Sequence, residues 1–141
     1  MRFSFTIPGP PVGKGRPRFT RIGQHVRTYT PTATTEYERT VAQYARIAMG
    51  DPADFPDGPI SVSVVAVAER PQRLRRKADH DGLIWRQAKP DCDNVAKAIL
   101  DALSPWFRDE RVCLLTVRSV YAERTGAPRV EVEVGIVAEG A

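Results

Sequence analysis

The residues best suited to chemistry lie in the stretch KPDCDNVAKAILDAL, positions 89–103. Asp91 and Asp93 stand one residue apart, and Lys97 follows four residues after Asp93. Two neighbouring carboxylates repel each other, so one pKa would rise unless a cation lay between them. Oxygen ligands of this kind favour hard cations such as Mg²⁺ or Mn²⁺. The pair therefore predicts a divalent metal site with a lysine beside it.

Simpler interpretations fit each of these residues alone. Asp93 at the start of a helix would be an ordinary N-cap. Lys97 and Asp101, four residues apart on a helix, would form a surface ion pair worth at most about 0.5 kcal/mol. A third carboxylate would strengthen the metal interpretation, and either Asp109 or Glu110 in the stretch WFRDERV is available for it.

Other catalytic patterns are weak in this sequence. His25 and His80 stand in unrelated stretches, and no Ser/His/Asp or Cys/His pattern accompanies them. GPPVGKG lacks the full GxxxxGK[ST] spacing of a phosphate-binding loop. Cys92 and Cys113 form no CxxC pair, and a disulfide between them is not expected. We expect the Cys92 side chain to point away from the aspartates as a small buried group.

The charge distribution indicates a polyanionic partner. The net charge is +4, but residues 1–35 contain no Asp or Glu and six Lys or Arg. A second basic run, RPQRLRRK, covers positions 70–77. Two basic stretches flanking an acidic motif favour nucleic acid over ordinary solvated loops.

Hydrophobic periodicity predicts one α+β domain over residues 1–141, in which a mixed sheet of about four strands packs with two helices. The first helix is expected to begin at a capping box formed by Thr35 and Glu38, and the second near Asp93. Proline and glycine predict a charged loop at 8–23, and the polar segment 69–88 predicts a mobile loop. The expected strands cover positions 2–7, 60–68, 112–122 and 129–137.

The apolar pattern predicts no membrane segment. Residues of the hydrophobic class make up 42% of the chain, and no run approaches the ~20 apolar residues of a membrane-spanning helix. The stretch MRFSFTIPGPP lacks the features of a secretory signal. We therefore expect a cytoplasmic protein.

Taken together, the motifs resemble the RusA family of Holliday-junction resolvases, which bacteriophages and prophages often carry. FTIPGPPVGKGRPRFTR is similar to the opening strand and basic loop of that family, and KPDCDNVAKAILDAL resembles its central D-x-D-N signature. By this resemblance Asp91 and Asp93 match the catalytic aspartates, and Lys97 matches the catalytic lysine. The third aspartate of the family usually lies in D-D-x-Q-V, where this chain has RDERV. Anchoring on the valine selects Asp109, and anchoring on the acidic doublet would select Glu110.

The resemblance implies a homodimer that binds a four-way DNA junction and nicks two opposed strands. Asp91, Asp93 and Asp109 would hold Mg²⁺, for which Mn²⁺ is a substitute. The basic residues would contact phosphates and make DNA binding depend strongly on salt. The candidate DNA-binding residues are Lys14, Arg16, Arg18, Arg73, Arg75, Arg76, Lys77 and Lys89.

Two other functions compete with the resolvase interpretation. One is a nuclease of broader specificity that cuts flaps or branched DNA without dimer symmetry. The other is a non-catalytic junction-binding protein, which the presence of the complete set of acidic residues and the lysine disfavours. Phe19 and Trp85 are candidates for stacking on an exposed base of the junction, but we expect both to be packed in the ordinary way.

Overall fold

The computed structural model describes residues 1–15, 18–29, 32–138 and 140, and it leaves out the side chains of Arg18 and Tyr29. Five strands form one mixed sheet in the order β1-β7-β4-β6-β5. The strands β4 and β6 run parallel, and every other neighbouring pair is antiparallel. Their bounds are β1 Arg2–Pro8, β4 Ile60–Ala68, β5 Ile84–Trp85, β6 Val112–Tyr121 and β7 Arg129–Ile136.

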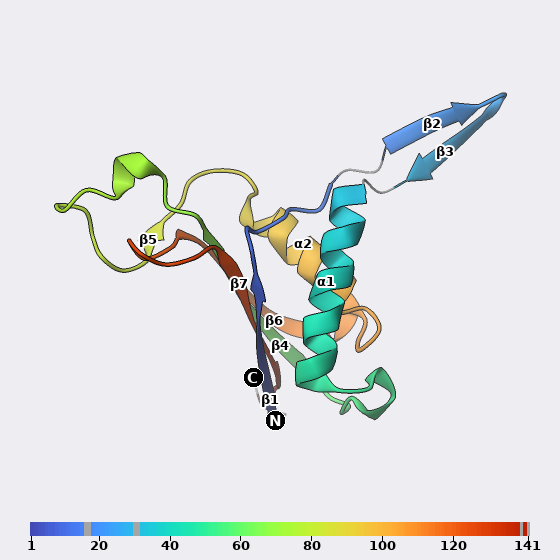
Figure 1. Ribbon diagram of the computed structural model, residues 1–141. Coiled ribbons are helices and arrows are strands. Elements are labelled where there is room, and N and C mark those ends of the chain that lie inside the picture. Colours follow the sequence, from blue (N-terminus) through green and yellow to red (C-terminus); the bar gives the residue numbers. More distant parts are fainter. Residues whose placement is uncertain (16–17, 30–31, 139, 141) are drawn as a thin grey trace.

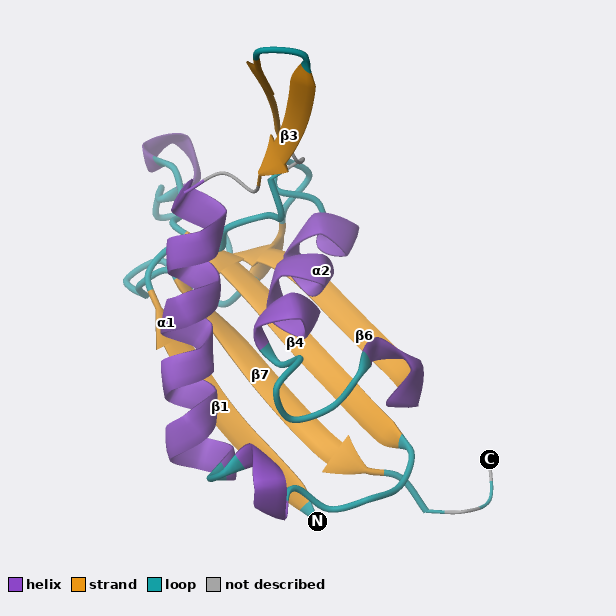
Figure 2. Ribbon diagram, turned by 90° about the vertical axis from the view of Figure 1, so that its right-hand side faces the viewer, coloured by secondary structure: helices purple, strands orange, loops and turns teal. Residues whose placement is uncertain are grey.

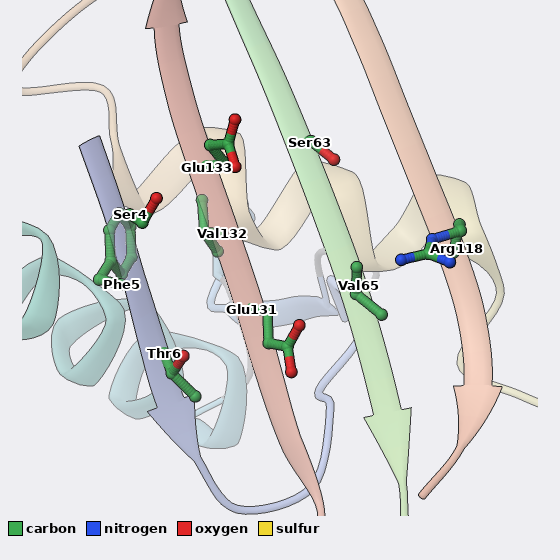
Figure 3. Close-up of a pocket in the computed structure, with 9 residues that line it drawn as sticks. All are labelled: Ser4, Phe5, Thr6, Ser63, Val65, Arg118, Glu131, Val132 and Glu133. Carbon is green, nitrogen blue, oxygen red and sulfur yellow. The ribbon is translucent and has the colours of Figure 1, made fainter. Parts of the chain in front are cut away.

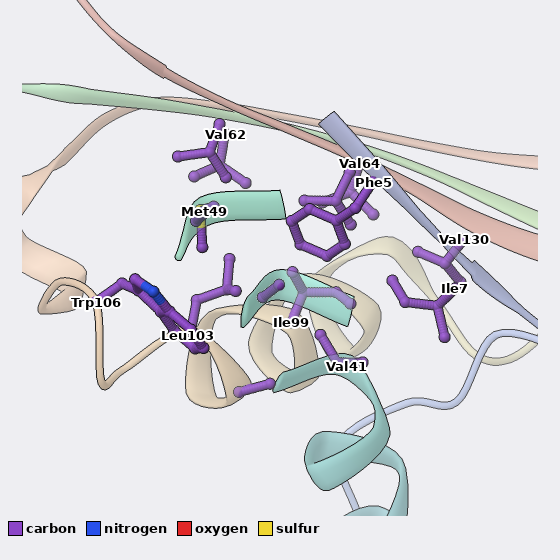
Figure 4. Close-up of a cluster of buried hydrophobic side chains, with 14 of the residues drawn as sticks. Phe5, Ile7, Val41, Met49, Val62, Val64, Ile99, Leu103, Trp106 and Val130 are labelled. Carbon is purple, nitrogen blue, oxygen red and sulfur yellow. The ribbon is translucent and has the colours of Figure 1, made fainter. Parts of the chain in front are cut away.

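Two helices, α1 (Thr32–Met49) and α2 (Cys92–Ala102), cover one face of the sheet (Figure 2). The apolar positions of the strands alternate, so one set of side chains from each strand faces these helices. Val130, Val132 and Val134 of β7 are buried in this way, as the alternation predicted. Figure 4 shows the core that results, in which α1 and α2 side chains meet the sheet. The mixed sheet with two helices confirms the predicted α+β class.

The first helix begins earlier than the sequence predicted. Helix α1 starts at Thr32, so Thr35 lies inside it and the expected capping box is wrong. Glu38 serves another contact, because its carboxylate accepts a hydrogen bond from Lys14 Nζ at 2.7 Å. The second helix agrees better with the prediction, since it starts at Cys92 with Asp91 as its N-cap residue.

A second, two-stranded sheet lies inside the segment predicted to be a loop. Strands β2 (Arg18–Ile22) and β3 (His25–Tyr29) form a hairpin that projects away from the rest of the protein (Figure 1). Gly23 has a φ of +60° at the turn, a conformation that tight hairpin turns require. The prolines that precede the hairpin masked this signal, because they dominate the composition of positions 8–17.

The basic segment 69–88 is more ordered than a mobile loop. It contains the short 3-10 turn Gln72–Leu74 and strand β5, and the buried Arg70 holds it together. The Arg70 guanidinium donates to the carbonyls of Ala122, His80 and Gly82 at 2.9, 2.6 and 2.5 Å. The first arginine of the basic run is therefore a structural residue.

The second face of the sheet is open over much of its area. A hollow of about 400 Å³ lies there, and its polar lining includes Ser63, Arg118 and Glu131 (Figure 3). None of the predicted catalytic or DNA-binding residues lines this hollow. The described residues also contain no helix that is long and apolar enough to span a membrane.

Candidate active site

The paired aspartates stand at the N-terminal end of α2. Asp91 is the N-cap residue, and its carbonyl accepts the first helical hydrogen bond from Val95 N at 3.1 Å. Its carboxylate accepts a hydrogen bond from Asn94 Nδ2 at 2.7 Å. That hydrogen bond, helped by the positive charge of Lys89, holds the pKa of Asp91 below its usual range. The N-terminal end of a helix also favours negative charge, so the site is electrostatically suited to an ionised carboxylate.

Lys97 shares the outer face of α2 with Asp93. Asp93 and Lys97 are both exposed and stand one helical turn apart. A surface ion pair between Lys97 and Asp101 was one interpretation of the sequence, but Asp101 instead pairs with Lys14 at 2.9 Å. Lys97 makes no ion pair with any residue that the structure describes. Its ammonium group is therefore available beside the aspartates.

Lys14 has a different role from the phosphate contact that was predicted. Its partly buried ammonium group pairs with Glu38 of α1 at 2.7 Å and with Asp101 of α2 at 2.9 Å. Burial alone would lower the pKa of Lys14, but its hydrogen bonds to Glu38 and Asp101 outweigh this effect and raise it. The lysine therefore ties the N-terminal segment to both helices, and few of its donors remain for DNA.

The N-terminal segment also touches the start of α2 through its backbone. Lys14 N donates to Asn94 O at 3.0 Å. A side chain on Gly13 would bring its Cβ to 2.8 Å from Pro90 Cβ and 3.3 Å from Asn94 Cβ, so this contact requires glycine. A hollow of about 670 Å³ lies at this contact and is lined by Gly13, Lys14, Lys89, Pro90, Asp91 and Asn94.

Arg86 supports the chain just before the aspartates, a role that no sequence motif predicted. Its guanidinium donates to Ala88 O at 3.1 Å and also to Lys89 O. The same group lies over the Tyr121 ring, 5.8 Å from its centroid. Arg86 therefore links the segment that carries Asp91 to the end of β6.

The candidate third carboxylates lie away from the aspartate pair. Asp109 and Glu110 belong to a short turn, Asp109–Arg111, that follows the C-terminal end of α2 and leads into β6. The eleven residues of α2 span about 16 Å, which separates this turn from Asp91. Arg111 anchors the turn by donating to Pro56 O and Gly58 O, both at 2.9 Å. Within the described residues, no group of three potential ligands could hold a metal ion.

Three smaller predictions need correction. Cys92 is exposed, and its Sγ lies 3.8 Å from Val117 O of β6, so it is not a buried group. Phe19 and Trp85 are also exposed, whereas ordinary packing was expected for both. These aromatic side chains are free to meet a ligand.

The predicted DNA-binding residues other than Lys14 fall into three groups. Arg73, Arg76, Lys77 and Lys89 are exposed. Arg75 is partly engaged, because its Nε donates to Arg70 O at 2.8 Å. The structure does not describe Arg16 or the side chain of Arg18, so these two predictions lie outside the described residues.

The donor set at the start of α2 fits a hard divalent cation. Asp91 and Asp93 offer exposed carboxylate oxygens, which Mg²⁺ prefers and usually supplements with water. Lys97 and Lys89 bring positive charge to the same end of the helix without occupying the carboxylates. This arrangement is suited to binding a phosphate group beside a metal ion.

Comparison with known proteins agrees with this chemistry. The family model described as endodeoxyribonuclease RusA matches residues 8–135, a range that contains every predicted site residue. The chain is also 31% identical over 135 residues to the uncharacterized protein YqaN of Bacillus subtilis (strain 168), a match that covers 91% of this chain and 92% of that protein. The chain therefore belongs to the RusA family of endodeoxyribonucleases.

Proposed function

We propose that this endodeoxyribonuclease is a Holliday-junction resolvase that uses Mg²⁺, or Mn²⁺ in its place, to nick two opposed strands of a four-way junction. The observation that carries the proposal is the exposed pair Asp91 and Asp93 at the start of α2, with the unpaired Lys97 one turn away. Family membership supports DNA cleavage, and the site supports metal-assisted hydrolysis.

Each residue of the site has a distinct task in this proposal. Asp91 and Asp93 hold the metal ion, and the Asn94 amide keeps the Asp91 carboxylate oriented and ionised. Lys97 binds the phosphate that is cut and offsets the negative charge that develops on it. The bound metal ion supplies an activated water and additional positive charge.

A homodimer through β6 would complete the site. The segment 112–118 of β6 has no strand on its outer side among the described residues, because β5 pairs only with Val120 and Tyr121. Leu114 and Leu115 are exposed on this edge, and an exposed apolar edge strand readily pairs with another chain. A two-fold axis would pair the two β6 edges in antiparallel fashion.

Such a dimer would supply the missing carboxylate. The start of β6 follows Asp109, whereas the N-terminal end of α2 lies beside the later part of the strand, at Val117. Antiparallel pairing sets the start of one strand against the end of the other. The third ligand for Asp91 and Asp93 would then be Asp109 of the partner subunit.

The exposed residues Arg73, Arg76, Lys77 and Lys89 are proposed to contact phosphates of the junction arms. Each such contact releases counterions, so the affinity would fall steeply with salt. The substrate also fits a cytoplasmic site of action in a bacterial cell, whether the gene is that of the host or of a prophage.

Cleavage mapping on a synthetic four-way junction tests the proposal. Each strand of an immobile junction is end-labelled in turn, and the cuts are mapped with Mg²⁺ and again with EDTA. We expect cuts at symmetric positions on two opposed strands, which EDTA abolishes. Single or scattered cuts would favour a broader branched-DNA or flap nuclease. A shifted junction band without cuts in Mg²⁺ or Mn²⁺ would favour a non-catalytic junction-binding protein.

A further inference from the structure

We propose that the β2–β3 hairpin is a branch-point probe, whose apolar side chains contact bases exposed at the centre of the junction while its arginines hold the flanking phosphates. The inference rests on the proposed function, because it takes branched DNA as the ligand. It assigns a binding role to a segment that does not contribute to the metal site.

The hairpin exposes an unusual amount of apolar surface for its size. Phe19, Ile22 and Val26 are 73%, 58% and 64% exposed. The register pairs Phe19 with Thr28 and Ile22 with His25, so apolar side chains stand on both faces of the ribbon. The only extensive contacts of the described residues of each strand are with the other strand. Because an isolated two-stranded sheet is marginally stable in water, a ligand that covers it would also stabilise it.

The charge of the hairpin selects an anionic ligand. Arg21 pairs with Val26 and Arg27 pairs with Thr20, so each face carries an arginine near an apolar side chain. No Asp or Glu occurs among residues 1–35. A two-stranded ribbon of this width fits the major groove of DNA. The combination of arginines with apolar wedges matches proteins that insert side chains between base steps.

A four-way junction exposes base faces that a linear duplex does not. In a continuous duplex the faces of the bases are stacked and closed to apolar side chains. Stacking is interrupted at the branch point, where base faces can accept Phe19 or an aliphatic side chain, and base–aromatic stacking contributes strongly to binding. The probe would therefore favour branched over linear DNA.

The described residues nearest to the hairpin in the sequence lie beside the candidate active site. On the side that leads into β2, Gly15 N donates to Thr34 Oγ1 of α1 at 3.0 Å, and Lys14 N donates to Asn94 O of α2 at 3.0 Å. On the other side, β3 is followed closely by the start of α1. Each five-residue strand extends about 17 Å, which corresponds to roughly five base pairs of DNA.

The test compares the parent protein with the variant Phe19→Ser/Ile22→Ser/Val26→Ser. Both are titrated against a four-way junction carrying 2-aminopurine at the branch point, and against a linear duplex of the same arm sequence. Ile47→Ser is the control, because Ile47 is 85% exposed on α1 and lies outside the hairpin. We expect the triple variant to lose about tenfold or more in junction affinity, to keep its duplex affinity, and to lose the fluorescence change at the branch point. A thermal melt checks that the three proteins fold alike.

A second variant tests the arginines separately. Arg21→Ala/Arg27→Ala removes two proposed phosphate contacts, so the slope of log affinity against log salt should become about two units shallower. An unchanged slope in this variant, together with unchanged junction affinity and fluorescence in the triple variant, would overturn the proposal. Equal losses for junction and duplex, with a shift from dimer to monomer on gel filtration, would also overturn it and would assign the hairpin to contacts between subunits. A parent protein that binds the junction without cutting it would contradict the nuclease function alone, because the hairpin is judged by binding.

Discussion

A substitution at Asp93 should affect DNA cleavage without affecting DNA binding. Replacing it by Asn keeps the size of the side chain and removes one of the two exposed charges at the start of α2. Mutating a residue that hydrogen-bonds a metal ligand typically lowers metal affinity or activity about 10–100-fold. Loss of the ligand itself should lower activity further. We expect Asp93→Asn to abolish junction cleavage and to leave junction binding nearly unchanged in a gel-shift assay. Cleavage at the parental rate would remove Asp93 from the metal site.

The charge of Lys14 makes the stability of the protein depend on pH. Its pKa is raised in the folded protein, because its hydrogen bonds to Glu38 and Asp101 outweigh the effect of burial. The folded state thus holds this proton more tightly than the unfolded state, whose lysine titrates near pH ~10.4. The stabilisation is complete below that pH and is lost as the pH rises through the folded pKa.

To test this, the free energy of unfolding of the parent protein and of Lys14→Met is measured by urea denaturation between pH 7 and 11. We expect the variant to be less stable by about 1 kcal/mol at pH 7, and this difference to shrink above pH ~10.4. A stability difference that stays constant across this range would show that the charge of Lys14 does not contribute.

Sequence reasoning was most successful where the interaction is local. The D-x-D-N spacing predicted the aspartate pair at a helix start, since a few neighbouring residues determine that geometry. The pairing of Lys14 with Asp101 could not be predicted, because the fold brings those residues together from distant parts of the chain. The contact of Arg86 with the Tyr121 ring was also not predictable, because these two residues are 35 positions apart in the sequence.

At the scale of elements, the contact between the N-terminal segment and α2 depends on Gly13. The added Cβ of Gly13→Ala would lie 2.8 Å from Pro90 Cβ, so either the segment or the start of α2 must move. We expect a loss of about 1–3 kcal/mol in the free energy of unfolding, together with reduced cleavage. Gly140→Ala is the matched control, since no atom lies within 4 Å of its added Cβ. Equal melting temperatures and cleavage rates for the two variants would contradict a tight contact.

The elements themselves were predictable to different degrees. Strand β4 has the predicted bounds. Its β-branched residues are mostly buried, so their alternation in the sequence matches the burial in the fold. The β2–β3 hairpin was missed, since both of its faces are exposed and it therefore has no single apolar face to detect. The predicted start of α1 was wrong because Thr35 and Glu38, whose spacing matches a capping box, both lie inside the helix.

At the scale of the whole molecule, the proposed dimer depends on the exposed edge of β6. Leu114→Asp would place a charge from each subunit in the interface, where neither has a partner. We expect this variant to elute as a monomer on gel filtration and to lose junction cleavage while keeping the melting temperature of a folded chain. Ile47→Asp, a matched change at an exposed residue of α1, should remain dimeric and active. A dimeric and active Leu114→Asp protein would exclude this edge as the interface.

In the proposed dimer, each active site combines Asp91 and Asp93 of one subunit with the third carboxylate of the other. Co-expression of Asp93→Asn and Asp109→Asn chains with two different affinity tags, followed by purification on both tags, yields a mixed dimer. One site of this dimer carries both substitutions, and the other carries none. The mixed dimer of Asp91→Asn and Asp93→Asn is the control, because it has no intact site.

Cleavage of an end-labelled four-way junction by these mixed dimers is the most direct measurement. We predict that the Asp93→Asn/Asp109→Asn dimer nicks one strand per junction in Mg²⁺, whereas each variant alone and the control dimer do not. An inactive mixed dimer, prepared beside an active parent dimer carrying the same tags, would contradict an active site shared between subunits.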